Sequence, residues 1–220
     1  MSIEQNLLSI KSTLPKQVTL VAVSKTKPVS DLMEAYEAGQ RVFGENKIQE
    51  MVEKWEMMPK DIQWHMIGHV QTNKVKFMAP FVNLIHGVDS LKLLQEIDKQ
   101  AKKNNRTIDC LLQIFVAEAV TKFGLDENEL ALLLSSTIFQ GLKNIRVIGL
   151  MGMATFTDNQ NQIKKEFTHL KTIFDKLQVM KTTNCQLNTI SMGMSGDYQL
   201  AIDCGSTMVR IGSSIFGGRK

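Results

Sequence analysis

A regular alternation of short apolar runs with longer segments of helical spacing most constrains how this chain can fold. Eight runs are rich in the β-branched and apolar residues that favour strands. They cover residues 18–23, 41–43, 63–67, 83–88, 109–116, 145–151, 186–191 and 208–212. A short amphipathic segment precedes the first run, and most of the later runs are separated by a helix-like segment. Strands that alternate with helices predict right-handed β-α-β units and a parallel sheet.

Two of the intervening segments carry clear helix signals. Asp89-Ser90 precedes one of them, and residues of this type favour helix N-caps. In another, apolar residues recur at steps of four and three, which predicts one buried face of a long helix. This stripe consists of Ile163, Phe167, Leu170, Phe174 and Leu177.

Eight such units within 220 residues fit a closed (β/α)8 TIM barrel with an extra N-terminal helix better than an open sheet. We find no linker rich in Pro, Gly or Ser and no shift in composition, so residues 1–220 are expected to form a single domain. The competing fold is a doubly wound dinucleotide-binding sheet. The sequence lacks the fingerprint of that fold, because no G-x-G-x-x-G motif follows the first apolar run.

Composition excludes several classes of function. The formal net charge is only +4, which argues against a nucleic-acid or membrane surface. No apolar run approaches the length of a membrane span, and the N-terminus lacks the pattern of a signal peptide. The three cysteines form no C-x-x-C motif, which argues against a zinc site or a disulfide framework and favours the cytoplasm. A monomer is expected because no apolar stripe is left unassigned.

In a barrel of this type the functional site lies at the carboxyl ends of the strands, and Lys25 follows the first predicted strand there. Partial desolvation in a barrel mouth lowers the pKa of an ammonium group and exposes a neutral amine that can condense with an aldehyde. The alternative is a lysine that is simply solvated.

Two turns of small residues follow the last two predicted strands, where barrels commonly bind phosphate. Ser195 lies between glycines ahead of a short predicted helix, and Gly212-Ser213-Ser214 follows the last strand. Free backbone N–H groups at a helix start favour an anion. The alternative is that Ser195 only caps the helix. A serine-hydrolase elbow is disfavoured, because G-x-S-x-G would require glycine at Asp197.

Arg210 alternates with apolar residues in the last predicted strand, so its side chain is expected to point into the barrel. A buried guanidinium must be paired. Its partner is either a structural group, such as a carboxylate, or a ligand acceptor, such as a ring nitrogen. Among the histidines, His65 and His69 are expected to lie apart, His86 is expected in the core, and no metal-binding motif is present.

A reactive lysine, a phosphate site and a buried arginine together suit an aldehyde on a phosphorylated aromatic ring. Pyridoxal 5′-phosphate (PLP) has all three features, since it offers an aldehyde, a phosphate and a pyridine nitrogen.

With these residues in place, the chain resembles the pyridoxal phosphate homeostasis protein family, which itself resembles the N-terminal barrel domain of alanine racemase. The resemblance extends from Val18 to Arg219. The matching stretches are VAVSKTKP (21–28), FGEN with Gln49-Glu50 (43–50), WHMIGHVQTNK (64–74), HGVDS (86–90), KFG (122–124), GLMGM (149–153) and SMGMSGDYQLAIDCGSTMVRIGSSIFGGR (191–219).

This resemblance implies that Lys25 forms a covalent aldimine with PLP and that Asn46 lies near the cofactor. It also implies that Ser195, Gly212 and Ser213 hold the phosphate and that Arg210 faces the pyridine nitrogen. The chain departs from the family at three positions. Lys47 replaces an aromatic residue, Phe115 stands where Asn is frequent, and Ser213 stands where Thr is common.

The expected function is PLP homeostasis without turnover: the protein holds PLP on Lys25 and releases it to other proteins, such as PLP-dependent recipient enzymes. An arginine opposite the pyridine nitrogen weakens the ring as an electron sink. Alanine racemase, moreover, adds a second domain with a catalytic tyrosine, for which this chain leaves no room. Both tyrosines, Tyr36 and Tyr198, fall in predicted helices. The alternatives are a small PLP-dependent amino-acid racemase and a barrel that binds another phosphorylated metabolite.

Overall fold

The eight predicted strands are present and close into a barrel in the order in which they occur along the chain. The computed structural model describes residues 2–117, 124–179 and 182–218. The strands are β1 (Thr19–Val23), β2 (Val42–Glu45), β3 (Gln63–Met66), β4 (Leu84–Val88), β5 (Ile108–Gln113), β6 (Ile145–Met151), β7 (Cys185–Ser191) and β8 (Met208–Ile211). All neighbouring pairs are parallel, and β1 closes the barrel on β8 with Val21 opposite Arg210.

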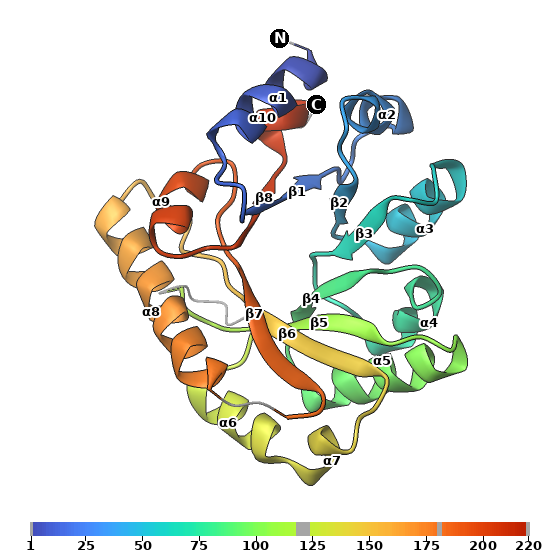
Figure 1. Cartoon of the computed structure of the whole chain (residues 1–220), viewed down its shortest axis with the longest axis vertical. Helices are drawn as coiled ribbons and strands as arrows, with labels where there is room; N and C mark the ends of the chain where they lie inside the picture. The colour runs from blue at the N-terminus through green and yellow to red at the C-terminus, as the bar shows by residue number, and fades with distance from the viewer. Residues whose placement is uncertain (1, 118–123, 180–181, 219–220) are drawn as a thin grey trace.

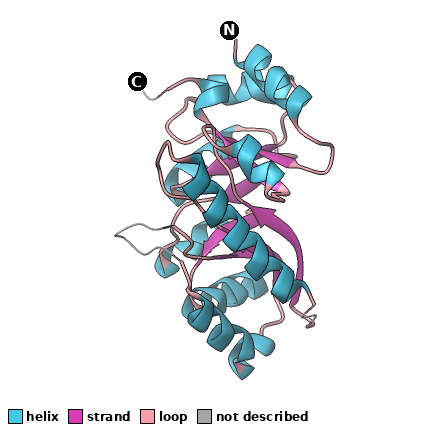
Figure 2. Cartoon of the chain, turned by 90° about the vertical axis from the view of Figure 1, so that its left-hand side faces the viewer, coloured by secondary structure: helices cyan, strands magenta, loops and turns pink. Residues whose placement is uncertain are grey.

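Helices surround the barrel on its outside (Figures 1 and 2). They are α1 (Ile3–Thr13), α2 (Val29–Glu37), α3 (Ile48–Met57), the 3-10 turn η1 (Thr72–Lys74), α4 (Val75–Met78), α5 (Leu91–Lys103), α6 (Glu127–Ser135), α7 (Thr137–Gln140), α8 (Gln160–Gln178), α9 (Tyr198–Asp203) and α10 (Ser213–Phe216). The fold prediction, a (β/α)8 barrel with an N-terminal helix, is therefore confirmed.

The N-terminal helix α1 begins with a capping box, in which Ser2 and Gln5 satisfy each other's backbone N–H groups. It packs beside α10, and Asn6 Nδ2 donates to the Ile215 carbonyl oxygen at 3.0 Å. The two ends of the chain therefore lie side by side (Figure 1). Ser90 caps α5 as predicted, and its side chain accepts from the backbone N–H of Leu93.

Two strand ends differ from the prediction by more than one residue. The fifth strand ends at Gln113 rather than at residue 116, because Ile114, although its N–H still donates to the Met151 carbonyl oxygen, forms a bridge with Leu125. The second strand runs on to Glu45 rather than ending at residue 43, because Gly44 and Glu45 still pair with β3.

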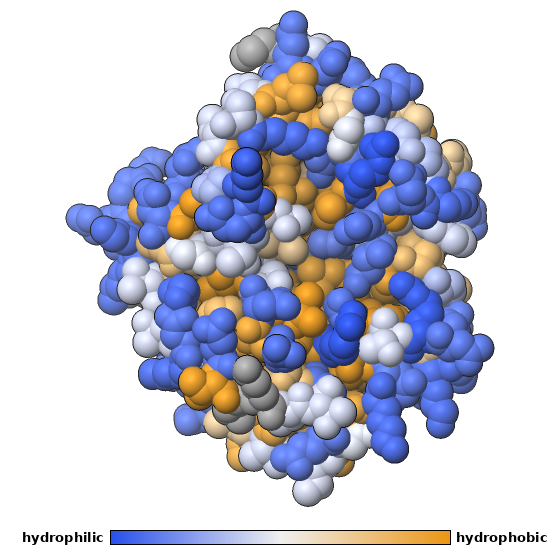
Figure 3. Space-filling view, in the orientation of Figure 1, coloured by the Kyte–Doolittle hydropathy of each residue, from blue (hydrophilic) through white to orange (hydrophobic). Residues whose placement is uncertain are grey.

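The apolar residues form two separate clusters. The larger one fills the space between the barrel and its helices and includes the buried α8 residues Ile163, Phe167, Leu170 and Phe174, as the stripe predicted. The smaller one lies inside the barrel, because its members come from strands on all sides: Val21, Leu84, Leu111, Met151 and Met208. In the orientation of Figure 1, hydrophobic residues are visible between hydrophilic ones near the middle of the face, whereas hydrophilic residues predominate around its edge (Figure 3).

Candidate functional site at the carboxyl ends of the strands

Strand alternation places a polar layer directly above the apolar floor of the barrel. Side chains two residues apart on a strand point to the same side, so His86 and Arg210 follow the interior residues Leu84 and Met208. The same step from Val21 leads through Val23 to Lys25, which lies just beyond β1 and is half-buried. Lys25 and Arg210 are therefore expected on the same side of the barrel wall, with Lys25 nearer the mouth.

Arg210 is buried, with only 4% of its surface exposed. One terminal nitrogen donates to the carbonyl oxygen and to Oγ of Ser191, at 2.9 and 2.7 Å, and the other donates to the Gly152 carbonyl oxygen at 3.1 Å. These partners are neutral oxygens of the protein itself, so Arg210 has structural partners, as one of the two alternatives expected, although no carboxylate bonds to it directly among the described residues. Burial lowers the pKa of Arg210 to about 10, although the nearby Asp197 carboxylate opposes that shift.

A chain of buried hydrogen bonds continues from Ser191 across the barrel. Ser191 Oγ lies 3.1 Å from His86 Nδ1, and His86 Nε2 lies 3.0 Å from His65 Nδ1. Arg210 donates to Ser191 Oγ, and this hydroxyl has one proton to give and a second lone pair to accept with. Each neutral imidazole likewise has one donor and one acceptor nitrogen, so the chain of hydrogen bonds can be completed in either direction.

Both histidines of this hydrogen-bonded chain, His65 and His86, are held neutral. Burial lowers the pKa of His65 to about 3. Burial also lowers the pKa of His86 well below its usual value, and the nearby His65 and Arg210 act in the same direction. His86 is thus the core histidine that the sequence predicted. His69 lies apart from His65, as expected, since it is exposed at the rim and 3.4 Å from Asp89.

The two small-residue turns meet at Ser195. Its Oγ accepts from the backbone N–H of Gly212 at 3.2 Å and from that of Ser214 at 3.5 Å. The residue that caps α9 is Asp197, so the alternative in which Ser195 only caps the helix that follows it is wrong. Ser195 Oγ bonds the start of α10 instead. The loops after β7 and β8 are thereby joined, and the exposed Ser213 lies at their junction.

Asn46 follows β2 and is packed tightly by glycines at the ends of the next two strands. A Cβ at position 68 would lie 2.4 Å from the Asn46 carbonyl oxygen, and one at position 87 would lie 2.5 Å from the Gly68 carbonyl oxygen. Only glycine allows the three strand ends to approach this closely. Lys47 is exposed beside Asn46, and Phe115 is half-buried.

Sequence reasoning missed several polar residues around the site. His65, His86 and Ser191 were not connected to Arg210, although inward-facing positions on predicted strands could have suggested it. The buried contacts of Glu45 and Lys54 were also missed, and no sequence signal pairs them. Of the predicted motifs, residues 122–123 and Arg219 lie outside the described residues.

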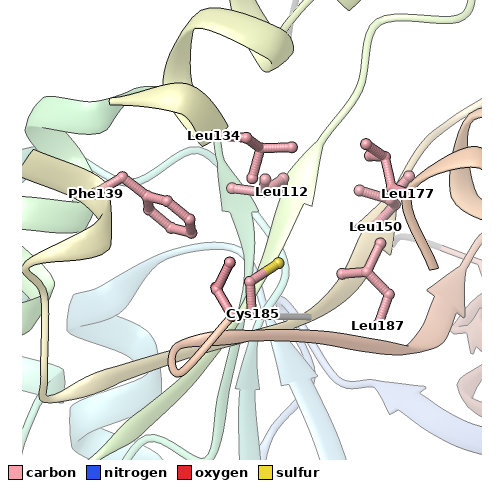
Figure 4. A pocket seen from close by; sticks show the side chains of 8 residues that line it. Leu112, Leu134, Phe139, Leu150, Leu177, Cys185 and Leu187 are labelled. Carbon is pink, nitrogen blue, oxygen red and sulfur yellow. The ribbon is translucent and has the colours of Figure 1, made fainter. Parts of the chain in front are cut away.

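An apolar cavity lies away from this mouth, between the barrel and α6, α7 and α8 (Figure 4). Leu112, Leu134, Phe139, Leu150, Leu177 and Leu187 contribute to its lining, and its volume is about 10 Å³. That is close to the smallest space able to hold one water, so it offers no ligand site. In the part of the chain that the structure describes, no group of three His, Cys, Asp or Glu side chains could hold a metal ion. No helix there is long and apolar enough to cross a membrane.

Comparison with known proteins agrees with this architecture. The family model "Alanine racemase, N-terminal domain" matches residues 1–220. The pyridoxal phosphate homeostasis protein of Aquifex aeolicus is 40% identical over 202 residues, which cover 91% of this chain and 87% of that protein. PipY of Synechococcus elongatus, solved with PLP bound, superposes with a TM-score of 0.88 at 34% identity, covering 98% of this chain and all of PipY.

The similarity to a complete alanine racemase is more distant. The enzyme of Clostridium difficile superposes with a TM-score of 0.79 at 16% identity, and the match covers 99% of this chain but 56% of the enzyme. At that identity the likeness concerns the fold alone. The family match and the relatives above 30% identity place the sequence more closely: the chain belongs to the alanine racemase N-terminal domain family and, within it, to the pyridoxal phosphate homeostasis proteins.

Proposed function

We propose that this protein binds PLP at the carboxyl ends of its barrel strands and serves intracellular PLP homeostasis without turnover catalysis. Support comes from relatives named for this role and from PipY, which was solved with PLP bound. The observation that carries the proposal is the joined turn of Ser195, Gly212 and Ser214, which lies at the same end of the barrel as Lys25 and the buried Arg210.

The joined turn fits a phosphate group. Ser195 Oγ accepts from the Gly212 and Ser214 N–H groups, which leaves its own O–H free to donate to a phosphate oxygen beside the hydroxyl of Ser213. Gly212 has no side chain and that of Ser213 is small, so the turn leaves room for an anion. The acidic residue in the same loop, the half-buried Asp197, is engaged within the loop, because its Oδ1 accepts from the Met194 N–H at 2.6 Å. Ser195, Gly212 and Ser213 would therefore hold the phosphate.

Arg210 would face the pyridine nitrogen, and Lys25 would hold the cofactor through a Schiff base, with Asn46 beside it. PLP supplies an aldehyde that links covalently to an amine and a ring that withdraws electrons. The Arg210 guanidinium is a donor that keeps its proton, so it would leave the pyridine nitrogen unprotonated and weaken that withdrawal. This supports binding and release rather than turnover.

Release would follow when another amine takes the place of Lys25, and we propose the lysine of a PLP-dependent recipient enzyme in this role. We propose a cytoplasmic monomer whose one domain spans residues 1–220. Size-exclusion chromatography with light scattering tests the oligomeric state directly.

The proposal is tested by adding PLP to the protein, recording its visible absorbance, and reducing the sample with borohydride. A Schiff-base band that borohydride bleaches, with the added mass on the Lys25 peptide, is expected. Lys25→Ala should abolish the band, whereas Lys47→Ala should retain it because that lysine is exposed beside the mouth. A native protein that forms no band would refute the proposal.

The second candidate is a small PLP-dependent amino-acid racemase, which the shared fold with alanine racemase favours. Incubation of the PLP-loaded protein with single-enantiomer alanine and serine distinguishes the two. Constant optical purity is expected, and sustained racemisation abolished by Lys25→Ala would replace the non-catalytic proposal.

A further inference from the structure

A buried charged cluster lies on the outer side of β1 and β2, beneath α3. We define the Lys54 cluster as Lys54, Glu45, Glu50 and Ser24. Lys54 Nζ donates to the Ser24 carbonyl oxygen at 2.8 Å, to Glu45 Oε1 at 2.7 Å and to Glu50 Oε1 at 2.7 Å. These three contacts use all the donors of an ammonium group.

The cluster is buried where charges are costly. The side chains of Lys54 and Glu45 are 6% and 0% exposed, and that of Glu50 is 22% exposed. Glu45 Oε2 is buried and has no hydrogen-bond partner among the described residues. Burial raises the pKa of Glu45, and the attraction of Lys54 opposes the shift. An apolar contact would join α3 to the barrel at lower cost, so docking the helix does not by itself require these charges.

The cluster instead contacts both chain neighbours of Lys25. On one side, Ser24 is held twice, because Lys54 binds its carbonyl oxygen and its Oγ donates to Glu45 Oε1 at 2.6 Å. On the other side, the Thr26 backbone N–H donates to Glu50 Oε1 at 2.6 Å. Lys25 is thus the single residue between two anchored points.

The turn at Lys25 needs such anchoring. Thr26 has a φ of +63°, a left-handed conformation that a β-branched residue rarely adopts. It persists only where surrounding contacts impose it. The charge-assisted bond from Thr26 to Glu50 supplies one such contact, and Lys54 fixes the position of the Glu50 carboxylate that accepts it.

We propose that Lys54, acting through Glu45 and Glu50, is a positioning residue that holds the Lys25 turn in the geometry needed to react with the PLP aldehyde. The inference deepens the proposed function and rests on it. The phosphate turn lies on the loops after β7 and β8 and makes no direct hydrogen bond to the Lys54 cluster among the described residues. Its link to the Lys25 turn runs through Lys27, which lies outside the cluster and donates to the Phe216 and Gly218 carbonyl oxygens. Loss of the cluster should therefore impair the reaction of Lys25 without impairing phosphate recognition.

The sharpest test compares Glu50→Leu with Glu53→Leu. Both replace a glutamate of α3 by the same residue, but Glu53 is exposed and bonds only Gln49 among the contacts the structure gives. Stopped-flow absorbance gives the rate at which Lys25 captures PLP. Calorimetry gives the affinity for pyridoxine 5′-phosphate, which has the phosphate and ring but no aldehyde. Lys54→Met, which removes the ammonium group itself, is measured in the same way.

Glu50→Leu and Lys54→Met should capture PLP about 10- to 100-fold more slowly, the effect expected of a small misplacement of a reacting group. Their affinity for pyridoxine 5′-phosphate should remain native, and Glu53→Leu should match the native protein in both measurements. If Lys54→Met does not fold, Glu50→Leu carries the test, since its side chain is partly exposed.

The outcomes distinguish failure of the proposed function from failure of the positioning role of Lys54. A native protein that never captures PLP refutes the proposed function before any variant is compared. A native protein that captures PLP at the same rate as Glu50→Leu overturns the positioning role. A loss of affinity for pyridoxine 5′-phosphate as large as the loss in the rate of PLP capture also overturns the positioning role. It would show that the cluster supports the whole mouth of the barrel rather than Lys25.

Discussion

The buried histidine pair makes the stability of this protein depend on pH in a way that the structure specifies. His65 has a pKa of about 3 in the folded chain, against about 6.5 when unfolded. Between these pH values His65 is protonated in the unfolded state but neutral in the folded state. The contribution of the buried neutral His65 to the unfolding free energy is therefore complete above about pH 6.5. This contribution is lost progressively as the pH falls towards 3.

The size of the effect follows from linkage. Lowering the pH from 7.5 to 5.0 protonates His65 in the unfolded chain only, and this should cost about 2 kcal/mol of unfolding free energy. His86 shifts in the same direction and adds to the loss. The variant His65→Asn keeps an amide group that can hydrogen-bond to His86 in either direction but removes the titrating group. It should be about 2 kcal/mol less sensitive to this change of pH than the native protein.

Urea unfolding at pH 7.5, 6.0 and 5.0, followed by tryptophan fluorescence, measures these free energies, because Trp64 is buried in the native state. Comparing native and variant at each pH cancels the contributions of titrating groups that do not interact with His65; His86 stays buried in both proteins. Leu134 lines the apolar cavity, so Leu134→Ala controls for simple destabilisation. Its unfolding free energy should keep the pH dependence of the native protein. Parallel pH curves for the native protein and His65→Asn would refute the neutral, buried histidine pair.

Two further predictions concern the mouth of the barrel. Ser195→Ala removes the oxygen that accepts from the Gly212 N–H at 3.2 Å and so joins the β7 and β8 loops. Calorimetry should show that PLP and inorganic phosphate bind about 10-fold more weakly. Affinities equal to those of the native protein would show that the Ser195 hydroxyl does not contribute to binding. Gly68→Ala would place a Cβ 2.4 Å from the Asn46 carbonyl oxygen, and urea unfolding should show a loss of about 1–3 kcal/mol. Gly196→Ala has open space for its Cβ and should change stability by less than about 0.5 kcal/mol, so equal effects of the two substitutions would contradict the packing at Asn46.

The sequence by itself determined the parts of this protein that depend on near neighbours in the chain. The α8 stripe is visible because residues three and four apart share a helix face. The eight strands are visible because each is a short apolar run, and their regular separation by helices predicts a closed parallel barrel. The same order placed Lys25, Ser195 and Gly212 at strand ends, which in a barrel of parallel strands lie at one face.

Only the tertiary structure decided which side chains meet. The chain from His65 through His86 and Ser191 to Arg210 joins four strands, and its members become partners only after the barrel closes with one particular register. Lys54 contacts Ser24 because α3 packs against β2 and β3 and its lysine side chain reaches the end of β1, which no local pattern encodes. Ser195 was predicted at the phosphate turn, but its bond to Gly212 depends on two loops that approach one another through space. Local periodicity follows from backbone geometry, whereas these polar partnerships follow from the packing of distant segments that must leave few buried donors unpaired.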